Sequence, residues 1–296
     1  MMKSPFLILL TFSTSTAVCI ADEPAAELPV AWEISEGLQA PESAYYDQAR
    51  DVLFLSQIGE GGGKAEDGDG WISKISTDGK VLKNKWVTGL NAPKGVRSHG
   101  KHLYVSDINR VVVIDIDAGK IERSLPVPDA VFLNDLATDS DGNVYVSDMV
   151  LSRIYRIKDG AVSVFAEGET LEHPNGVLVD GASLIIGGWG SGFNTEDFST
   201  KVPGRLQKID LKTKQTSPIT TAPTGHLDGI EADGNGGYIV TDWRNGKLFH
   251  ISADGSTKLL QTFPRGAADH AYLQKPGLII LPRMLENKLT AFRFRP

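Results

Sequence analysis

A short pattern recurs six times along the chain: a polar residue, an apolar run, a turn and a second apolar run. The polar residue that opens each occurrence is called the anchor from here on. The six anchors are Glu42, Lys94, Asn134, Asn175, Asp228 and Asp269. Three of the five intervals between them are 40 or 41 residues long, and the other two are 52 and 53. A strand-rich repeat of about 40 residues is typical of β-propellers.

Each repeat reads as a series of strands joined by turns. Two β-rich runs follow each anchor, separated by Asp, Gly and Asn residues as in Ser140–Asn143, which is the composition of hairpin turns. A third run follows in all six repeats and a fourth in most, and no helical periodicity of useful length occurs. The sequence therefore predicts an all-β fold, a six-bladed β-propeller with four-stranded blades, as a single domain over residues 22–296.

The two ends of the chain complement each other. The sixth repeat ends at Phe294 without a fourth strand, whereas Val30–Ile34 forms a strand-like run ahead of the first anchor. We expect this N-terminal strand to pair with the last blade, which closes the ring and covers a sheet edge.

Insertions explain the two long intervals. They are Gly59–Gly70 and Gly188–Gly204, and both fall between the second and third strands of their repeats. We expect loops at one end of the propeller. Trp189 and Phe193 in the second insertion would either cover an apolar pocket or pack internally.

Residues 1–21 have the features of a signal peptide. Lys3 precedes an apolar run, and Cys19 and Ala21 are small residues suited to cleavage after Ala21. The run is too short for a membrane span, which needs about 20 apolar residues, so we expect none. Lipid attachment at Cys19 is the alternative. Because Cys19 is the only cysteine, cleavage leaves a chain without disulfides or a cysteine zinc site. The prediction is a secreted or periplasmic protein.

The anchors are the candidate functional residues. In a propeller the first strand of each blade lines the central channel, so the anchors should meet at one end of it. All six are polar but of different types, which indicates a shared site rather than a repeated structural role. Glu42, Asn134, Asn175 and Asp228 offer only hard oxygen ligands, which suit a divalent metal such as Ca²⁺. Zn²⁺ and Mn²⁺ remain open.

The same positions resemble a known family. The segments that carry the resemblance are Leu133–Asp135, His173–Gly176 and His226–Gly229, together with Glu42 ahead of the first strand. They resemble the senescence-marker-protein/gluconolactonase/luciferin-regenerating-enzyme-like family. Its members are six-bladed propellers that hold a divalent metal in the central channel and hydrolyse lactones and some phosphotriesters.

The resemblance implies a role for each matched residue. Glu42, Asn175 and Asp228 would ligate the metal, and Asn134 would contact the substrate or a metal-bound water. Asp228 would also act as general base, and the metal would polarise the lactone carbonyl. The sugar lactonases carry an arginine where this chain has Phe132, and Ser43-Ala44 follows Glu42 in place of Gly-Pro. We therefore expect a more apolar substrate.

The other anchors are candidates for substrate binding. Lys94 and Asp269 would either pair with each other in the channel or contact the substrate. His270 would line the channel mouth or bond to the backbone. A net charge of −7 argues against nucleic acid as a partner. We expect a monomer that acts on a small molecule. The alternative function is a non-catalytic propeller that binds a protein or glycan.

Overall fold

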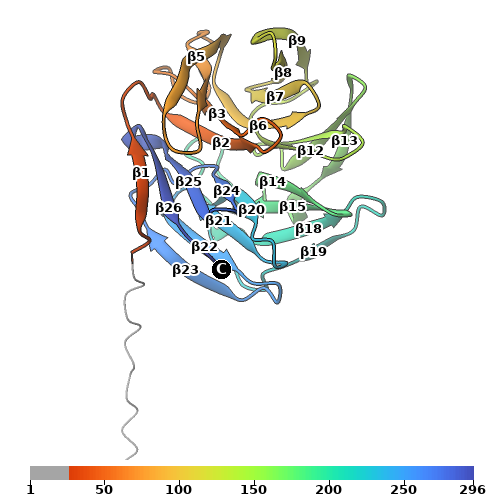
Figure 1. Ribbon diagram of the computed structural model, residues 1–296. Helices are drawn as coiled ribbons and strands as arrows, with labels where there is room; N and C mark the ends of the chain where they lie inside the picture. The colour runs from red at the N-terminus through yellow and green to blue at the C-terminus, as the bar shows by residue number, and fades with distance from the viewer. Residues whose placement is uncertain (1–26) are drawn as a thin grey trace, which may run out of the picture.

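Six four-stranded antiparallel sheets surround a central channel in the computed structural model, which describes residues 27–296 (Figure 1). The first strands of neighbouring blades contact one another around the ring. This confirms the predicted six-bladed propeller. The predicted signal peptide, residues 1–21, lies outside the described residues. No helix in residues 27–296 is long and apolar enough to cross a membrane.

The blades follow one another in chain order. Blade 1 consists of β2 (Pro41–Asp47), β3 (Val52–Gln57), β4 (Gly70–Ile75) and β5 (Val81–Leu90). Blade 2 consists of β6 (Pro93–His99), β7 (His102–Asp107), β8 (Arg110–Asp115) and β9 (Lys120–Pro126). Blade 3 consists of β10 (Leu133–Thr138), β11 (Val144–Asp148), β12 (Arg153–Lys158) and β13 (Ala161–Glu167). Blade 4 consists of β14 (Pro174–Asp180), β15 (Ser183–Gly188), β18 (Leu206–Asp210) and β19 (Thr216–Pro218). Blade 5 consists of β20 (Leu227–Ala232), β21 (Tyr238–Asp242), β22 (Lys247–Ile251) and β23 (Thr257–Thr262). Blade 6 consists of β24 (Ala271–Leu273), β25 (Leu278–Arg283), β26 (Lys288–Arg293) and β1 (Val30–Ile34).

The N-terminal strand closes the ring as predicted. β1 pairs antiparallel with β26, so the last blade takes its outer strand from the start of the chain. Glu33 on β1 accepts hydrogen bonds from Lys288 Nζ at 2.9 Å and Thr290 Oγ1 at 2.9 Å. These contacts join residues more than 250 positions apart and cover an edge that would otherwise be free to pair with another chain.

The apolar core is divided among the blade interfaces. One buried cluster lies at each of the six junctions between neighbouring blades. At the junction of blades 6 and 1, for example, Leu53 and Leu55 pack with Ile280 and Leu289. Each sheet is therefore apolar on both faces, which is why its strands read as continuous apolar runs.

The first strands of blades 1 to 5 each have a β-bulge at their anchor. In blade 1, Pro41 pairs with Gln57 and Ala44 pairs with Leu55, so Glu42 and Ser43 both lie opposite Ser56. Blades 2 to 5 show the same register shift. Five anchors thus lie inside their strands rather than ahead of them as the sequence suggested, because the extra residue interrupts the ladder after the strand has begun.

Hydroxyl groups on the second strands hold these bulges. Ser147 Oγ accepts a hydrogen bond from Asp135 N at 3.1 Å and donates one to Asn175 O of the next blade at 2.6 Å. Thr241 does the same in blade 5, with Gly229 N at 2.8 Å and Ala268 O at 3.1 Å. Ser147 thereby ties the backbone of the Asn175 anchor to blade 3, and Thr241 ties Ala268, the residue before the sixth anchor, to blade 5.

Close approach between blades explains the glycine after the Asn175 anchor. A Cβ on Gly176 would lie 1.6 Å from the Asp228 carbonyl oxygen. Gly176→Ala should therefore lower the free energy of unfolding by about 3 kcal/mol. Urea denaturation measures this. Gly63→Ala is the control, because its Cβ would meet nothing closer than 3.7 Å. A Gly176→Ala midpoint equal to that of the control would contradict this close packing of blades 4 and 5.

Candidate active site

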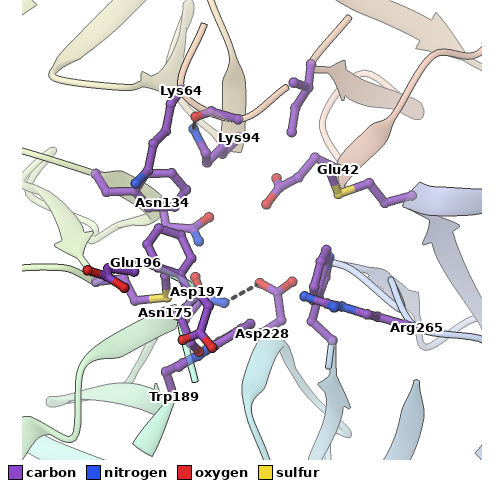
Figure 2. Close-up of a pocket in the computed structure, with 17 residues that line it drawn as sticks. Glu42, Lys64, Lys94, Asn134, Asn175, Trp189, Glu196, Asp197, Asp228 and Arg265 are labelled. Carbon is purple, nitrogen blue, oxygen red and sulfur yellow. Dashed lines mark hydrogen bonds between the residues drawn. The ribbon is translucent and has the colours of Figure 1, made fainter. Parts of the chain in front are cut away.

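Five anchors meet in one pocket at the end of the channel (Figure 2). Its volume is about 340 Å³. The five residues come from five different blades and are all buried. They are Glu42, Lys94, Asn134, Asn175 and Asp228. All four residues predicted to ligate a metal are among them.

Three oxygens in this group have no hydrogen-bond partner in the described part of the chain. They are Glu42 Oε2, Asn134 Oδ1 and Asn175 Oδ1, and all three are buried. Asn175 Nδ2 donates to Asp228 Oδ1 at 3.1 Å, which fixes the amide and leaves its oxygen free (Figure 2). Buried oxygens without donors cost free energy, so their convergence indicates a place for a ligand that supplies positive charge or donors.

The donor set is all oxygen, with two carboxylates and two amides. Within residues 27–296, no three His, Cys, Asp or Glu side chains come together in a metal-binding group. A cation here would thus depend on the amide oxygens of Asn134 and Asn175. Hard cations accept such mixed oxygen ligands and complete their shell with water.

Burial shifts the protonation of the pocket residues. It raises the pKa of Glu42 well above its usual value, and repulsion from Asp228 and Asp269 adds to this effect. Burial likewise raises the pKa of Asp228, with repulsion from Asp269 and Asp135. Without a cation, both carboxyl groups therefore favour the protonated form.

Two predicted substrate-binding residues, Asp269 and His270, do not line this pocket. Asp269 accepts hydrogen bonds from Ser43 Oγ and from Arg97 Nη1, the latter at 3.2 Å. Asp269 and Lys94 do not pair with each other, because the Lys94 ammonium donates to backbone carbonyls instead. Burial lowers the pKa of His270 to about 4, and neither ring nitrogen has a partner in the described chain.

Asp269 belongs to a second buried cluster that the sequence analysis missed. Arg97 lies within 3.9 Å of Asp135, 3.8 Å of Glu231 and 3.2 Å of Asp269, so it joins carboxylates of three other blades. Burial raises the pKa of Asp135 to about 7 and that of Glu231 to about 8. One signal was available: Arg97 and Glu231 each follow their anchor by three residues.

The pocket walls are largely apolar, and both insertions contribute to them. Trp189 lines the pocket, which is one of the two positions expected for it. Phe193 instead stacks on His173, with ring centroids 4.5 Å apart. Phe132 contacts Phe198 of the same insertion edge to face at 5.3 Å. Phe198 and Lys64 also line the pocket, although the sequence analysis assigned neither of them to it.

Comparisons with known proteins identify the family and the fold of the chain. The chain matches the SMP-30/Gluconolactonase/LRE-like region over residues 40–268. That range begins just ahead of β2 and ends next to the sixth anchor. A search of curated proteins found no significant match.

Solved structures share the fold at low sequence identity. A gluconolactonase from Xanthomonas campestris has a TM-score of 0.63 at 15% identity, covering 92% of this chain and 99% of that one. A catalytically inactive virginiamycin B lyase from Staphylococcus aureus, solved with quinupristin, has a TM-score of 0.61 at 14% identity. That match covers 89% of this chain and 98% of the lyase. With the family match over most of its length, the chain belongs to the SMP-30/gluconolactonase/LRE-like family and is a lactonase-like propeller.

Proposed function

We propose that this protein is a Ca²⁺-dependent hydrolase of lactones. The observation that carries the proposal is the convergence of three buried, unpartnered oxygens beside Asp228 in one pocket. Membership of the family and the likeness to a gluconolactonase support lactones as the substrate class. Phe132 and the other aromatic walls favour an apolar lactone over a sugar lactone.

The residues present fit a hard divalent cation. Glu42, Asn134, Asn175 and Asp228 would hold it, because each presents an oxygen and none presents sulfur or imidazole nitrogen. A cation bound there would polarise the lactone carbonyl and stabilise the negative charge that develops on its oxygen.

The chain's own groups would complete the reaction. Asp228 accepts the Asn175 amide on one carboxylate oxygen, which orients the second oxygen to take a proton from the attacking water. The water oxygen bonds to the acyl carbon, the ring C–O bond breaks, and the proton passes to the released alkoxide to give a hydroxy acid. Asn134 Nδ2 would donate to the substrate and hold its ester group in place.

We further propose that residues 1–21 direct the protein to the periplasm or the outside of the cell. The protein would act there as a monomer on a small molecule.

Metal binding and turnover test the proposal separately. Thermal melting with Ca²⁺, Zn²⁺ or Mn²⁺ should show the largest stabilisation with Ca²⁺. A pH-indicator assay should then show hydrolysis of apolar lactones in preference to sugar lactones and phosphotriesters. The absence of stabilisation by every metal would overturn the proposal. Stabilisation without turnover of any substrate would favour the non-catalytic binding function.

The pH dependence of calcium stabilisation follows from the shifted carboxyl groups. The pKa values of Glu42 and Asp228 are raised, so Ca²⁺ must displace protons at low pH, and its affinity rises with pH. In metal-free protein the sign is opposite: the folded state holds protons that the unfolded chain has lost above about pH 4 to 5, so stability falls as pH rises. The Tm difference between calcium and chelator should therefore be small at pH 5 and large at pH 8.

The double variant Glu42→Gln/Asp228→Asn is the control for this measurement. It lacks both titrating groups, so calcium should have no effect on its Tm at either pH. A calcium effect of equal size at pH 5 and pH 8 in the native chain would contradict the prediction.

A further inference from the structure

Three cationic side chains line the pocket without a carboxylate partner. They are Lys64, Lys94 and Arg265. Within residues 27–296 none of them forms an ion pair, although other basic residues of the chain do so repeatedly. Figure 2 shows Lys64 and Lys94 on one side of the pocket and Arg265 on the other. A pocket with unpaired cations is suited to an anion.

Lys94 is the most constrained of the three. It is 2% exposed, and its ammonium donates to Gly63 O at 2.9 Å and Ala92 O at 3.1 Å. An ammonium has three donors, so one hydrogen remains for a ligand. Burial lowers the pKa of Lys94 to about 8, while attraction to Glu42 opposes that shift and repulsion from Lys64 adds to it.

The two lysines are arranged around an apolar surface. Lys94 Nζ lies 4.5 Å from the centre of the Phe132 ring, and Lys64 Nζ lies 5.9 Å from the same centre. Lys64 Nζ is also 4.5 Å from the centre of the Phe198 ring. Positive charge and aromatic surface are therefore offered together on one wall.

The charge balance of the pocket leaves this wall positive. The carboxylates of Glu42 and Asp228 would together neutralise a bound divalent cation, so neither would remain to balance Lys94. Glu196 and Asp197 also line the pocket, but both are exposed on the second insertion, where solvent and salt screen their charges.

We propose that the pocket selects compounds in which an anionic group is attached to an apolar body, with the anion bound by Lys94 and the body against Phe132. The proposal rests on the proposed function, in that the favoured substrates would be lactones that carry such a group. Lys64, which lies beside Phe198 on the same wall, would add a weaker attraction because its charge is exposed.

Equilibrium binding tests the charge preference without requiring hydrolysis. Benzenesulfonate and benzenesulfonamide are close in shape but differ in charge, and a sulfonate is a weak ligand for calcium. Quenching of Trp189 and Trp243, which line the pocket, reports their binding. With calcium present, the native protein should bind the sulfonate about tenfold more tightly than the sulfonamide. Equal affinities would overturn the proposal.

Variants assign the preference to Lys94. Lys94→Met should remove it and Lys94→Arg should retain most of it. Lys64→Met should reduce it by about threefold, because that charge is exposed. Lys74→Met is the matched control, since Lys74 lies 4.1 Å from the Trp86 ring centre, away from the pocket. A preference that survives in both Lys94→Met and Lys64→Met would overturn the assignment, and circular dichroism establishes that each variant is folded.

A kinetic comparison separates this proposal from the proposed function. A dihydrocoumarin and its carboxylated derivative form a neutral and an anionic lactone pair. The kcat/KM ratio of anionic to neutral lactone should exceed one in the native chain and fall about tenfold in Lys94→Met. Calcium-dependent hydrolysis with no preference for the anion would retain the lactonase and overturn the anion site. Anion binding with no hydrolysis of any lactone would retain the anion site and overturn the lactonase.

Discussion

Asp228→Asn should abolish the calcium-induced rise in Tm and lower lactone hydrolysis by about a thousandfold. Asparagine keeps the shape of the side chain and an oxygen to accept the Asn175 amide, which lies 3.1 Å from Asp228 Oδ1. It removes a negative charge that a cation needs and the carboxylate proposed to accept a proton from water. Thermal melting and initial-rate assays at pH 8 measure the two effects.

The same substitution should stabilise the metal-free protein. Burial and neighbouring carboxylates raise the pKa of Asp228. At pH 8 the folded chain must therefore either ionise this buried group or take up a proton, and both cost folding free energy that the neutral amide avoids. In chelator at pH 8 the Tm of Asp228→Asn should therefore exceed that of the native chain. Asp254→Asn, on an exposed turn, should change neither property. A variant that loses Tm in chelator and keeps its response to calcium would contradict both the metal site and the charge argument.

Arg97→Met should lower the free energy of unfolding by about 3 to 5 kcal/mol at pH 8. Arg97 is buried and is the cation shared by Asp135, Glu231 and Asp269. Methionine fills much of the same volume but leaves these carboxylates without a counter-charge. The loss should shrink toward pH 5, because Asp135 and Glu231, with pKa values of about 7 and about 8, become protonated there.

Chemical denaturation at the two pH values measures this effect. Arg50→Met is the control. Arg50 forms an ion pair with Asp47 at 2.9 Å, and its side chain is partly exposed to solvent. Such a pair contributes about 1 kcal/mol or less. A loss for Arg97→Met no larger than for Arg50→Met, or one that grows toward pH 5, would show that the cluster does not depend on this charge.

The repeat determines which parts of the fold and of the site could be predicted from the sequence. A position that recurs at the same place in every blade, such as Glu42 or Asn175, is assigned to the channel once the period is recognised. The pairing of Val30–Ile34 with the last blade follows from counting strands. The bulges at the anchors were not predictable in this way, because they depend on the register between strands.

Residues outside the repeat pattern were beyond the same reasoning. Lys64 and Phe198 reach the pocket from insertions whose paths depend on tertiary packing.

Asp269 was expected among the other anchors, but its side chain pairs with Arg97 and Ser43 away from the pocket. The long side chain of Arg97 reaches Asp269 from another blade, and the spacing of residues in the sequence does not reveal such a contact.

The pairing of β1 with β26 also constrains the order of folding. β1 has no partner until β26 has been synthesised, so the first strand in the chain is among the last to be placed. Contacts of such long sequence separation form slowly, because chain entropy must be lost before they yield stabilisation. Once formed, they join the two ends of the chain in one sheet. Unfolding that begins at either end must then break the same ladder, which favours slow unfolding and a long-lived native state.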